Sequence, residues 1–333
     1  MLLRQRDILR FTAVTPSITV LIAAYNAEGF VGRAVASALT QSLAPLEVLV
    51  VDDASTDDTV AVVGQLARAD SRVKLITLPQ NGGPSAARNA GLDAARGEWV
   101  AVLDADDAFM PQRLHRMLSY AVESGADIVV DNFRSYKPAT NNIGPAVLDE
   151  GAENSLIPFE DFLARARPLR GEADWGLLKP IFRQAFPQEH GLRYPLASRH
   201  GEDFLFMVDA FAHGARYALV REAGYLYTGR SSNLSRSTLN YHLMYEHTRA
   251  LIGDERFRTD PLLVRRLHER AAAVRLLAAI TDYERFQRER DYASLARHLL
   301  LDNTFRTFVG KKLVRSLVRL PAKRQAGKPH RPH

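Results

Sequence analysis

Short apolar runs alternate with amphipathic stretches through the first 135 residues of the chain. Between the first two runs, apolar residues recur at helical spacing, from Phe30 and Val31 to Ala38 and Leu39. This alternation is typical of a parallel sheet with crossover helices. The strands are predicted at residues 18–23, 46–51, 73–78, 98–103 and 127–133. We therefore predict an α/β fold with a Rossmann-like, mostly parallel sheet flanked by helices.

Two further helices are marked by residues that favour helix ends. The pattern predicts one helix over residues 56–69, with Ser55 or Thr56 as its N-cap, because a hydroxyl oxygen there accepts a free amide N–H. The next is predicted over residues 84–95, with a proline as its first residue and Gly97 as its stop signal.

The second half of the chain is less regular. Residues 137–158, rich in Pro, Asn, Gly and Ala, are typical of a long loop. Order returns around a helix that is predicted to begin near Gly201, and residues 241–301 are charged and helical in pattern. We predict a main domain with a helical C-terminal extension, divided as 15–240 (in halves 15–135 and 136–240), 241–304 for the extension and 305–333 for a basic tail.

Composition and charge narrow the functional classes. The 333 residues include no cysteine, so a metal would need oxygen or imidazole ligands. The net charge is +6, but residues 305–333 hold nine Lys or Arg and no Asp or Glu, and subtracting these nine leaves −3 for the rest. A basic tail on an acidic body argues against nucleic-acid binding. Without an apolar run of roughly 18 residues or a secretory signal pattern, we expect a cytoplasmic protein.

Three acidic residues, Asp104, Asp106 and Asp107, follow the apolar run at 98–103. At the end of a buried strand they repel one another unless a cation or protons compensate them. Ligands of open α/β sheets bind at this edge. Two interpretations stay open: a metal site, and a solvated acidic turn that caps a helix near Pro111.

A second acidic group, from Asp52 to Asp58, follows the run at 46–51. One of its carboxylates could accept a hydrogen bond from a base or a ribose hydroxyl. Alternatively, the group caps the next helix and compensates its dipole. Together with the turn at 82–85 and Arg88, the two acidic strand ends form a pocket suited to a metal, a diphosphate and a nucleoside.

Four segments in register resemble the family 2 glycosyltransferases of the GT-A fold. They are residues 19–26 (TVLIAAYN), 50–59 (VVDDASTDDT), 82–91 (GGPSAARNAG) and 97–107 (GEWVAVLDADD). Because the four segments occur in the order and spacing of the family, together they identify it more specifically than any single segment does. The resemblance implies a catalytic domain over residues 15–240, with a nucleotide-sugar-binding half followed by an acceptor half that carries the catalytic base.

The resemblance also implies roles for individual residues. Mn²⁺ or Mg²⁺ would be held by Asp106 and Asp107, and the nucleotide would lie at the strand ends and the turn at 82–85. The implied donor-binding residues are Ala23, Tyr25, Asp53, Gly83, Pro84, Arg88, Asp104 and Asp106.

Later segments resemble the acceptor half of the family. In GEDFLF, residues 201–206, Asp203 matches the catalytic base and Glu202 lies beside it, although such a pair is also an ordinary favourable charge at a helix start. Trp175 and Lys179 lie where similar enzymes approach the acceptor, although an isolated Trp is more often part of a core.

The segment 225–236 is similar to the family's closing segment, which implies a diphosphate-binding role for Arg230. The family often carries Arg at the position of Thr228, so the chain departs from the pattern there.

The implied reaction is inverting transfer of a hexose, with UDP-glucose as the leading donor, to a saccharide hydroxyl, forming a β-linkage. In length and tail the chain resembles bacterial exopolysaccharide glycosyltransferases of the succinoglycan type. The expected acceptor is therefore a saccharide or a lipid-linked oligosaccharide.

The tail predicts an amphipathic helix. Phe305, Val309, Leu313 and Leu317 line one face, with basic residues on the flanks. This pattern indicates attachment to an anionic membrane surface, on the inner face of the plasma membrane, through residues 305–333. The alternative is a helix docked on the rest of the chain, followed by a disordered basic end.

Rival functions lack their motifs. A sugar-nucleotidyltransferase needs a Gly-rich loop and basic residues after the first strand, where residues 23–26 read AAYN, and no dinucleotide-binding G-x-G-x-x-G follows a strand. A non-catalytic nucleotide-sugar-binding protein of the same fold stays an alternative. The joint presence of the three aspartates at 104–107 and of Asp203 argues against it.

Overall fold

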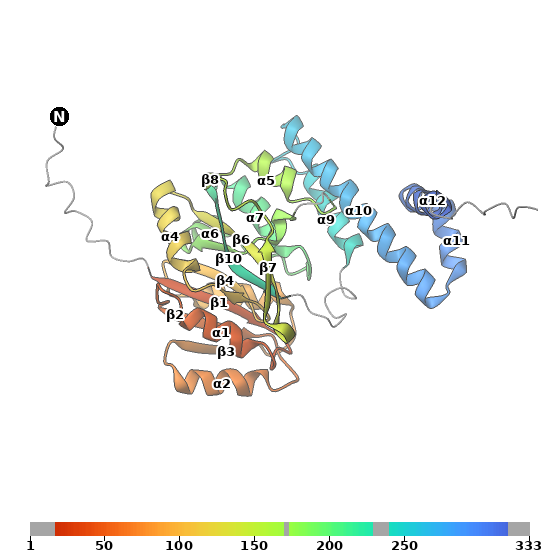
Figure 1. Ribbon diagram of the computed structural model, residues 1–333. Coiled ribbons are helices and arrows are strands. Elements are labelled where there is room, and N and C mark those ends of the chain that lie inside the picture. Colours follow the sequence, from red (N-terminus) through yellow and green to blue (C-terminus); the bar gives the residue numbers. More distant parts are fainter. Residues whose placement is uncertain (1–16, 170–172, 229–239, 319–333) are drawn as a thin grey trace, which may run out of the picture.

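One continuous sheet organises residues 18–228 (Figure 1). The computed structural model describes residues 17–169, 173–228 and 240–318. The strand order is β3-β2-β1-β4-β9-β6-β10-β5, with β7 paired to β6 and β8 paired to β10. The strands are β1 (Ile18–Ala24), β2 (Glu47–Asp52), β3 (Val73–Thr77), β4 (Trp99–Asp104), β5 (Ala108–Phe109), β6 (Ile128–Lys137), β7 (Asn142–Ala146), β8 (Ser155–Leu156), β9 (Pro180–Arg183) and β10 (Tyr217–Thr228).

The first half of the sheet is parallel. β1 pairs in parallel with β2 on one side and with β4 on the other, with Ala24 opposite Asp52 and Ala23 opposite Asp104. The carboxyl ends of these three strands therefore meet at one edge. β9 enters antiparallel between β4 and β6, and β6 runs parallel to β10. The predicted α/β fold is confirmed, and the five predicted strands correspond to β1, β2, β3, β4 and β6.

Helices cover both faces of the sheet, which explains why its strands are continuous apolar runs. All six residues of β2 and five of the six in β4 are buried. Alternate residues of β1 enter different cores: Leu21 packs with α3 (Pro84–Ala94) and α7 (Glu202–Ala212). Val20 and Ile22 pack with α1 (Val31–Leu39) and α4 (Arg113–Ser124). The other helices of this part are α2 (Thr59–Ala69), α5 (Phe159–Arg165) and α6 (Ala185–His190).

The predicted cap of the second helix is wrong. α2 begins at Thr59, so neither Ser55 nor Thr56 is its N-cap. The Ser55 hydroxyl instead accepts the backbone N–H of Asn26 at 3.0 Å, and the Thr56 N–H donates to the Asn26 side chain at 2.9 Å. These hydrogen bonds join the loop after β1 to the loop after β2. Ser55 and Thr56 therefore bond to Asn26 and do not cap the helix.

The predicted long loop at 137–158 also contains strands. β6 extends to Lys137, and the chain returns as β7 after a turn in which Asn141 has a φ of 50°. Pro145 fits in β7 because this strand pairs only with β6, and an edge strand tolerates a missing N–H donor. The residues typical of loops therefore form a turn and an edge strand.

The C-terminal helices are α9 (Tyr241–Ile252), α10 (Pro261–Glu289), α11 (Tyr292–Leu301) and α12 (Asn303–Val318), as the charged helical pattern predicted. Arg270 of α10 is buried against α7 and the end of α5. Its guanidinium carbon lies 3.5 Å from the centroid of the Phe204 ring, and Nη1 donates to the main-chain oxygen of Ala166.

The far end of α10 carries α11 and α12 away from the sheet (Figure 1). A small separate core holds this end together, built from Ala279, Phe286, Phe305 and Val309. Two apolar residues of the predicted tail helix, Phe305 and Val309, are therefore used in packing within the chain. The described residues include no helix that is both long and apolar enough to cross a membrane.

The close approach at Gly97 gives a test of the sheet packing. A Cβ there would lie 2.4 Å from the Thr19 nitrogen and 2.8 Å from the Ile18 carbonyl carbon, both backbone atoms that cannot step aside. We expect Gly97→Ala to lower the free energy of unfolding by about 2 kcal/mol or more, measured by urea denaturation. Gly32→Ala on α1 is the control, because its added Cβ would meet no atom within 4 Å beyond its chain neighbours and the backbone of its own helix. Equal stability of the two variants would contradict the packing.

Candidate functional site

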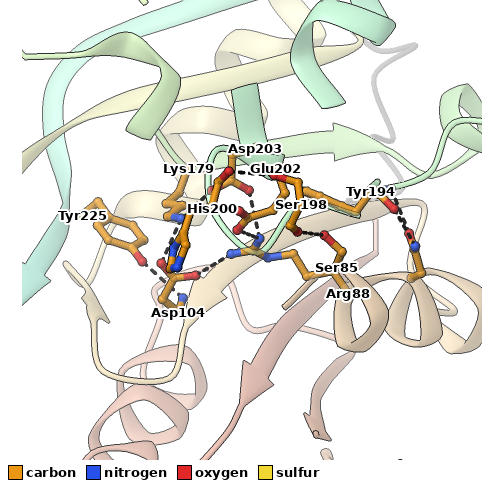
Figure 2. Close-up of polar contacts among 11 residues, drawn as sticks. Ser85, Arg88, Asp104, Lys179, Tyr194, Ser198, His200, Glu202, Asp203 and Tyr225 are labelled. Atoms are coloured by element: carbon orange, nitrogen blue, oxygen red, sulfur yellow. Dashed lines mark hydrogen bonds and ion pairs between the residues drawn. The ribbon is translucent and has the colours of Figure 1, made fainter. Parts of the chain in front are cut away.

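The candidate site lies at the sheet edge where β1, β2 and β4 end (Figure 2). The N-terminal halves of α3 and α7 bring further polar residues to this edge. Figure 2 shows the side chains of Arg88 and Lys179 reaching Asp104, with Glu202 and Asp203 beside them.

Asp53 fixes the turn before α3. Its buried carboxylate accepts the N–H of Gly82 at 2.7 Å and the N–H of Gly83 at 2.8 Å. Gly83 has a φ of 83°, a left-handed conformation that favours glycine, and Pro84 then begins the helix. The predicted Asp53, Gly83 and Pro84 are thus brought together, with Asp53 bonded to backbone amides.

The predicted nucleoside residues of β1 lie at the same edge. Ala23 is partly buried and pairs with Val51 of β2 and Asp104 of β4. Tyr25 follows the strand and is 47% exposed, so its ring faces solvent at the strand end. The edge therefore combines a small residue with an accessible aromatic ring.

Arg88 is buried among three carboxylates. Its Nη2 lies 2.9 Å from Asp104 Oδ1, and its Nη1 lies 2.6 Å from Glu202 Oε1 and 3.2 Å from Asp203 Oδ1. Burial alone would lower the pKa of Arg88, but the surrounding carboxylates, Asp203 foremost, raise that pKa well above its ordinary value. Arg88 therefore joins β4 to the start of α7.

Lys179, the residue before β9, also joins β4 to the start of α7. Its Nζ lies 2.8 Å from Asp104 Oδ2 and 2.7 Å from Asp203 Oδ2. Burial would lower the pKa of Lys179, and the two carboxylates raise it above its ordinary value. Its main-chain oxygen accepts a bond from Arg113, which pairs with the buried Asp131. The lysine is thus held rigidly between two aspartates.

The three strand-end aspartates have different environments. Burial would raise the pKa of Asp104, but Lys179 and Arg88 lower it below its ordinary value. Burial raises the pKa of Asp107 well above its ordinary value, and Asp104 and Asp106 raise it further. Asp106 is partly buried, and its main-chain oxygen accepts a bond from Arg33. The cations beside Asp104 therefore favour its charged form, whereas the surroundings of Asp107 disfavour a negative charge there.

Asp107 also anchors β10. Its Oδ2 accepts the Tyr225 hydroxyl and its Oδ1 accepts the Thr228 N–H, both at 2.7 Å. Each carboxylate oxygen keeps a second lone pair. Among the residues that the structure describes, no three His, Asp or Glu side chains converge as metal ligands. One or two carboxylates suffice for Mg²⁺ when substrate phosphates and waters complete the shell, so the carboxylates of Asp106 and Asp107 have the chemistry to bind a divalent cation.

Asp203 and Glu202 are buried at the first turn of α7, which confirms the predicted helix start near Gly201. Gly201 precedes the helix with a φ of 78°. A carboxylate at a helix N-terminus is favoured by the dipole, and here each also pairs with Arg88. The two residues are thus part of the charge network with Asp104.

The other predicted residues are distributed differently. Trp175 is 3% exposed and packs in the core with Phe204, while Arg165 lies over its ring at 5.1 Å. Its acceptor role stays a prediction, as does that of Lys179, which is in the network. Arg230 lies outside the described residues.

Three site residues are absent from the sequence prediction. Tyr225 bonds to Asp107 and accepts the N–H of Asp104 at 3.2 Å, and the Tyr194 ring lies 5.2 Å from the Arg88 guanidinium. Arg33 of α1 donates to Thr228 at 2.6 Å. Tyr225 lies in a recognisable segment, but the sequence holds no local signal for Tyr194 or Arg33.

Comparison with known proteins agrees with this geometry. Residues 19–186 match the glycosyl transferase family 2. The chain is 38% identical over 265 residues to the succinoglycan biosynthesis protein ExoO of Rhizobium meliloti (strain 1021), covering 78% of this chain and 74% of that protein. It is 37% identical over 267 residues to ExoU of the same strain, covering 78% and 76%.

A crystal structure of S. aureus TarS 1-349 in complex with UDP-GlcNAc has the same fold, with a TM-score of 0.62 and 23% identity over 76% of this chain and 72% of that one. Another, of TarS 1-349 in complex with UDP, has a TM-score of 0.57. With the GT-A fold, the strand-end aspartates and two relatives above 30% identity, the chain belongs to glycosyl transferase family 2.

Proposed function

We propose that this glycosyltransferase transfers a hexose, glucose from UDP-glucose, to a hydroxyl of a saccharide acceptor with inversion at C1. The observation that carries the proposal is the network around Asp203, whose carboxylate shares Lys179 and Arg88 with Asp104. A base candidate and a donor-binding aspartate are thereby held in one site. The relatives ExoO and ExoU, named for succinoglycan biosynthesis, support a role in exopolysaccharide biosynthesis.

The nucleotide is proposed to bind at the end of β1. The exposed ring of Tyr25 offers a face on which a base can stack, beside Ala23 and the turn that Asp53 fixes. TarS binds UDP and UDP-GlcNAc on the same fold, which supports a uridine nucleotide. Arg88 and Asp104 lie at the same edge.

Mn²⁺ or Mg²⁺ is proposed to bind to Asp106 and Asp107, because a cation there would favour the charged form of Asp107, which burial, Asp104 and Asp106 disfavour by raising its pKa. When bound, the cation offsets the charge that develops on the departing nucleoside diphosphate. It would also lower the raised pKa of Asp107, so that metal and donor binding support each other.

Asp203 is proposed to accept the proton of the acceptor hydroxyl as the glycosidic bond to the donor breaks. Both of its oxygen atoms face cations, Lys179 and Arg88. Proton transfer therefore requires that one of these contacts lengthen. A donor diphosphate carries the negative charge to draw either cation away, which makes donor binding the first step.

The acceptor is proposed to be a lipid-linked saccharide reached from an anionic membrane surface. Among the described residues, three of the four most exposed large hydrophobic side chains lie on α11: Leu300 (75%), Leu301 (74%) and Tyr292 (62%). Arg297 shares their exposed face, and α11 holds no acidic residue. Because Phe305 and Val309 are buried, we propose that α11 provides the apolar contact and residues 305–333 the charge.

The catalytic proposal is tested with Asp203→Asn. We expect transfer of glucose from UDP-glucose to a lipid-linked acceptor fraction to fall by about 10²- to 10⁴-fold, because the amide cannot take the proton. Stabilisation of the variant by UDP with Mn²⁺, measured as the unfolding temperature, should persist, and EDTA should abolish it.

Asp209→Asn is the matched control, because it makes the same change on α7 in a pair with the exposed Arg256. It should leave transfer unchanged. Retained turnover in Asp203→Asn would remove the residue from this role. A wild-type protein that UDP stabilises but that transfers no sugar would favour a non-catalytic binding protein.

The membrane proposal is tested by flotation with vesicles of phosphatidylcholine alone or mixed with phosphatidylglycerol. The wild-type chain should float with the anionic vesicles, less so at high salt. The double variant Leu300→Ser/Leu301→Ser should bind about tenfold more weakly, because it loses two apolar contacts. Val122→Ser, at a 57% exposed position of α4, is the control. Equal flotation of the wild-type and double-variant proteins would exclude α11 as the contact.

A further inference from the structure

Arg33 of α1 presents a guanidinium group with too few acceptors beside the acidic end of β4. Its Nη2 donates to the main-chain oxygen of Asp106 and, at 2.6 Å, to the Thr228 hydroxyl. Its Nε and Nη1 are buried and have no hydrogen-bond partner among the residues that the structure describes. The guanidinium carbon lies 4.7 Å from the centroid of the Tyr136 ring. The cation is thus oriented by three neighbours while two of its nitrogen atoms are unused.

The positive charge of Arg33 also lacks a carboxylate partner among the described residues. Arg88 pairs with three carboxylates and Lys179 with two, whereas Arg33 forms no ion pair within the described part of the chain. A buried donor without an acceptor is unfavourable, and more so when it is charged. An incoming anion would accept a hydrogen bond from the guanidinium and would also pair with its positive charge.

The surroundings of Arg33 define which anion fits. Its acceptor Asp106 is a proposed metal ligand, and its acceptor Thr228 is bonded through its N–H to Asp107. An anion at Arg33 would therefore lie beside a divalent cation, as the phosphates of a metal-bound nucleotide do. A guanidinium that is oriented by protein contacts and keeps an unused N–H suits a phosphate oxygen.

We propose that Arg33 binds the diphosphate of the nucleotide-sugar donor, a role that rests on the proposed function. In this role Nη1 donates to a phosphate oxygen, the positive charge pairs with the diphosphate, and Tyr136 and Thr228 hold the guanidinium plane. Arg33 would thereby add a second arginine to the site: Arg33 comes from α1, and Arg88 comes from α3.

The test compares a diphosphate with its nucleoside. Affinities for UDP, with Mn²⁺, are measured by calorimetry, and those for uridine by ligand-observed NMR, for wild-type protein, Arg33→Gln and Arg33→Lys. We expect Arg33→Gln to weaken UDP binding about 10- to 100-fold and to leave uridine binding unchanged within about twofold. Arg33→Lys keeps the charge without the planar guanidinium and should be intermediate.

Arg68→Gln, the same change at an exposed position in the last turn of α2, is the control and should bind UDP like wild type. The unfolding temperature without ligand shows whether each variant is folded. Unchanged UDP affinity in a folded Arg33→Gln would overturn the proposal. An equal loss of UDP and uridine binding would also overturn it, since Arg33 would then only shape the site. Wild-type protein that binds none of UDP, GDP and CDP would overturn the proposed function as well.

Discussion

Three carboxyl groups, those of Asp104, Glu202 and Asp203, lie around Arg88 where β4 ends and α7 begins, and their mutual repulsion is the constraint that the rest of the site satisfies. Arg88 and Lys179 meet this constraint by sharing Asp104 and Asp203 between them. Removing Lys179 would leave Arg88 to compensate Asp104, Glu202 and Asp203 by itself among the described ion pairs, which is unfavourable. The side chains of Arg88 and Lys179 therefore join β4 to α7 and bring the proposed base to the proposed donor-binding edge.

The topology explains how residues so distant in sequence meet. Parallel pairing of β1 with β2 and β4 aligns their carboxyl ends, and antiparallel β9 then brings Lys179 to the same edge. The buried pair of Arg113 and Asp131 supports this position through the Lys179 main-chain oxygen. The stability of the site and its proposed function thus depend on one strand order, while the ring of Tyr25 and several apolar side chains of α11 are exposed.

Much of this architecture is predictable from sequence, because strands buried on both faces are continuous apolar runs and polar residues follow them. The position of Asp104, Asp106 and Asp107 at a strand end is predicted in this way, and so is the helix start at Gly201. Contacts between distant segments are not predictable from such patterns. Lys179 lies 24 residues from Asp203, and Arg33 lies 195 residues from Thr228. For the same reason the amphipathic pattern of the tail does not reveal that Phe305 and Val309 pack in a core with α10.

The central claim is tested most directly by the free energy of unfolding of wild-type protein and Lys179→Met between pH 3 and 7, with the exposed Lys74→Met as control. At pH 7 we predict a loss of about 3 kcal/mol, since a buried ion pair is broken. Lys179 lowers the pKa of Asp104, so this contribution is present above the unfolded pKa of about 3.9 and is lost below it. The loss should therefore shrink towards pH 3. An equal loss at both pH values, or none at pH 7, would contradict the account.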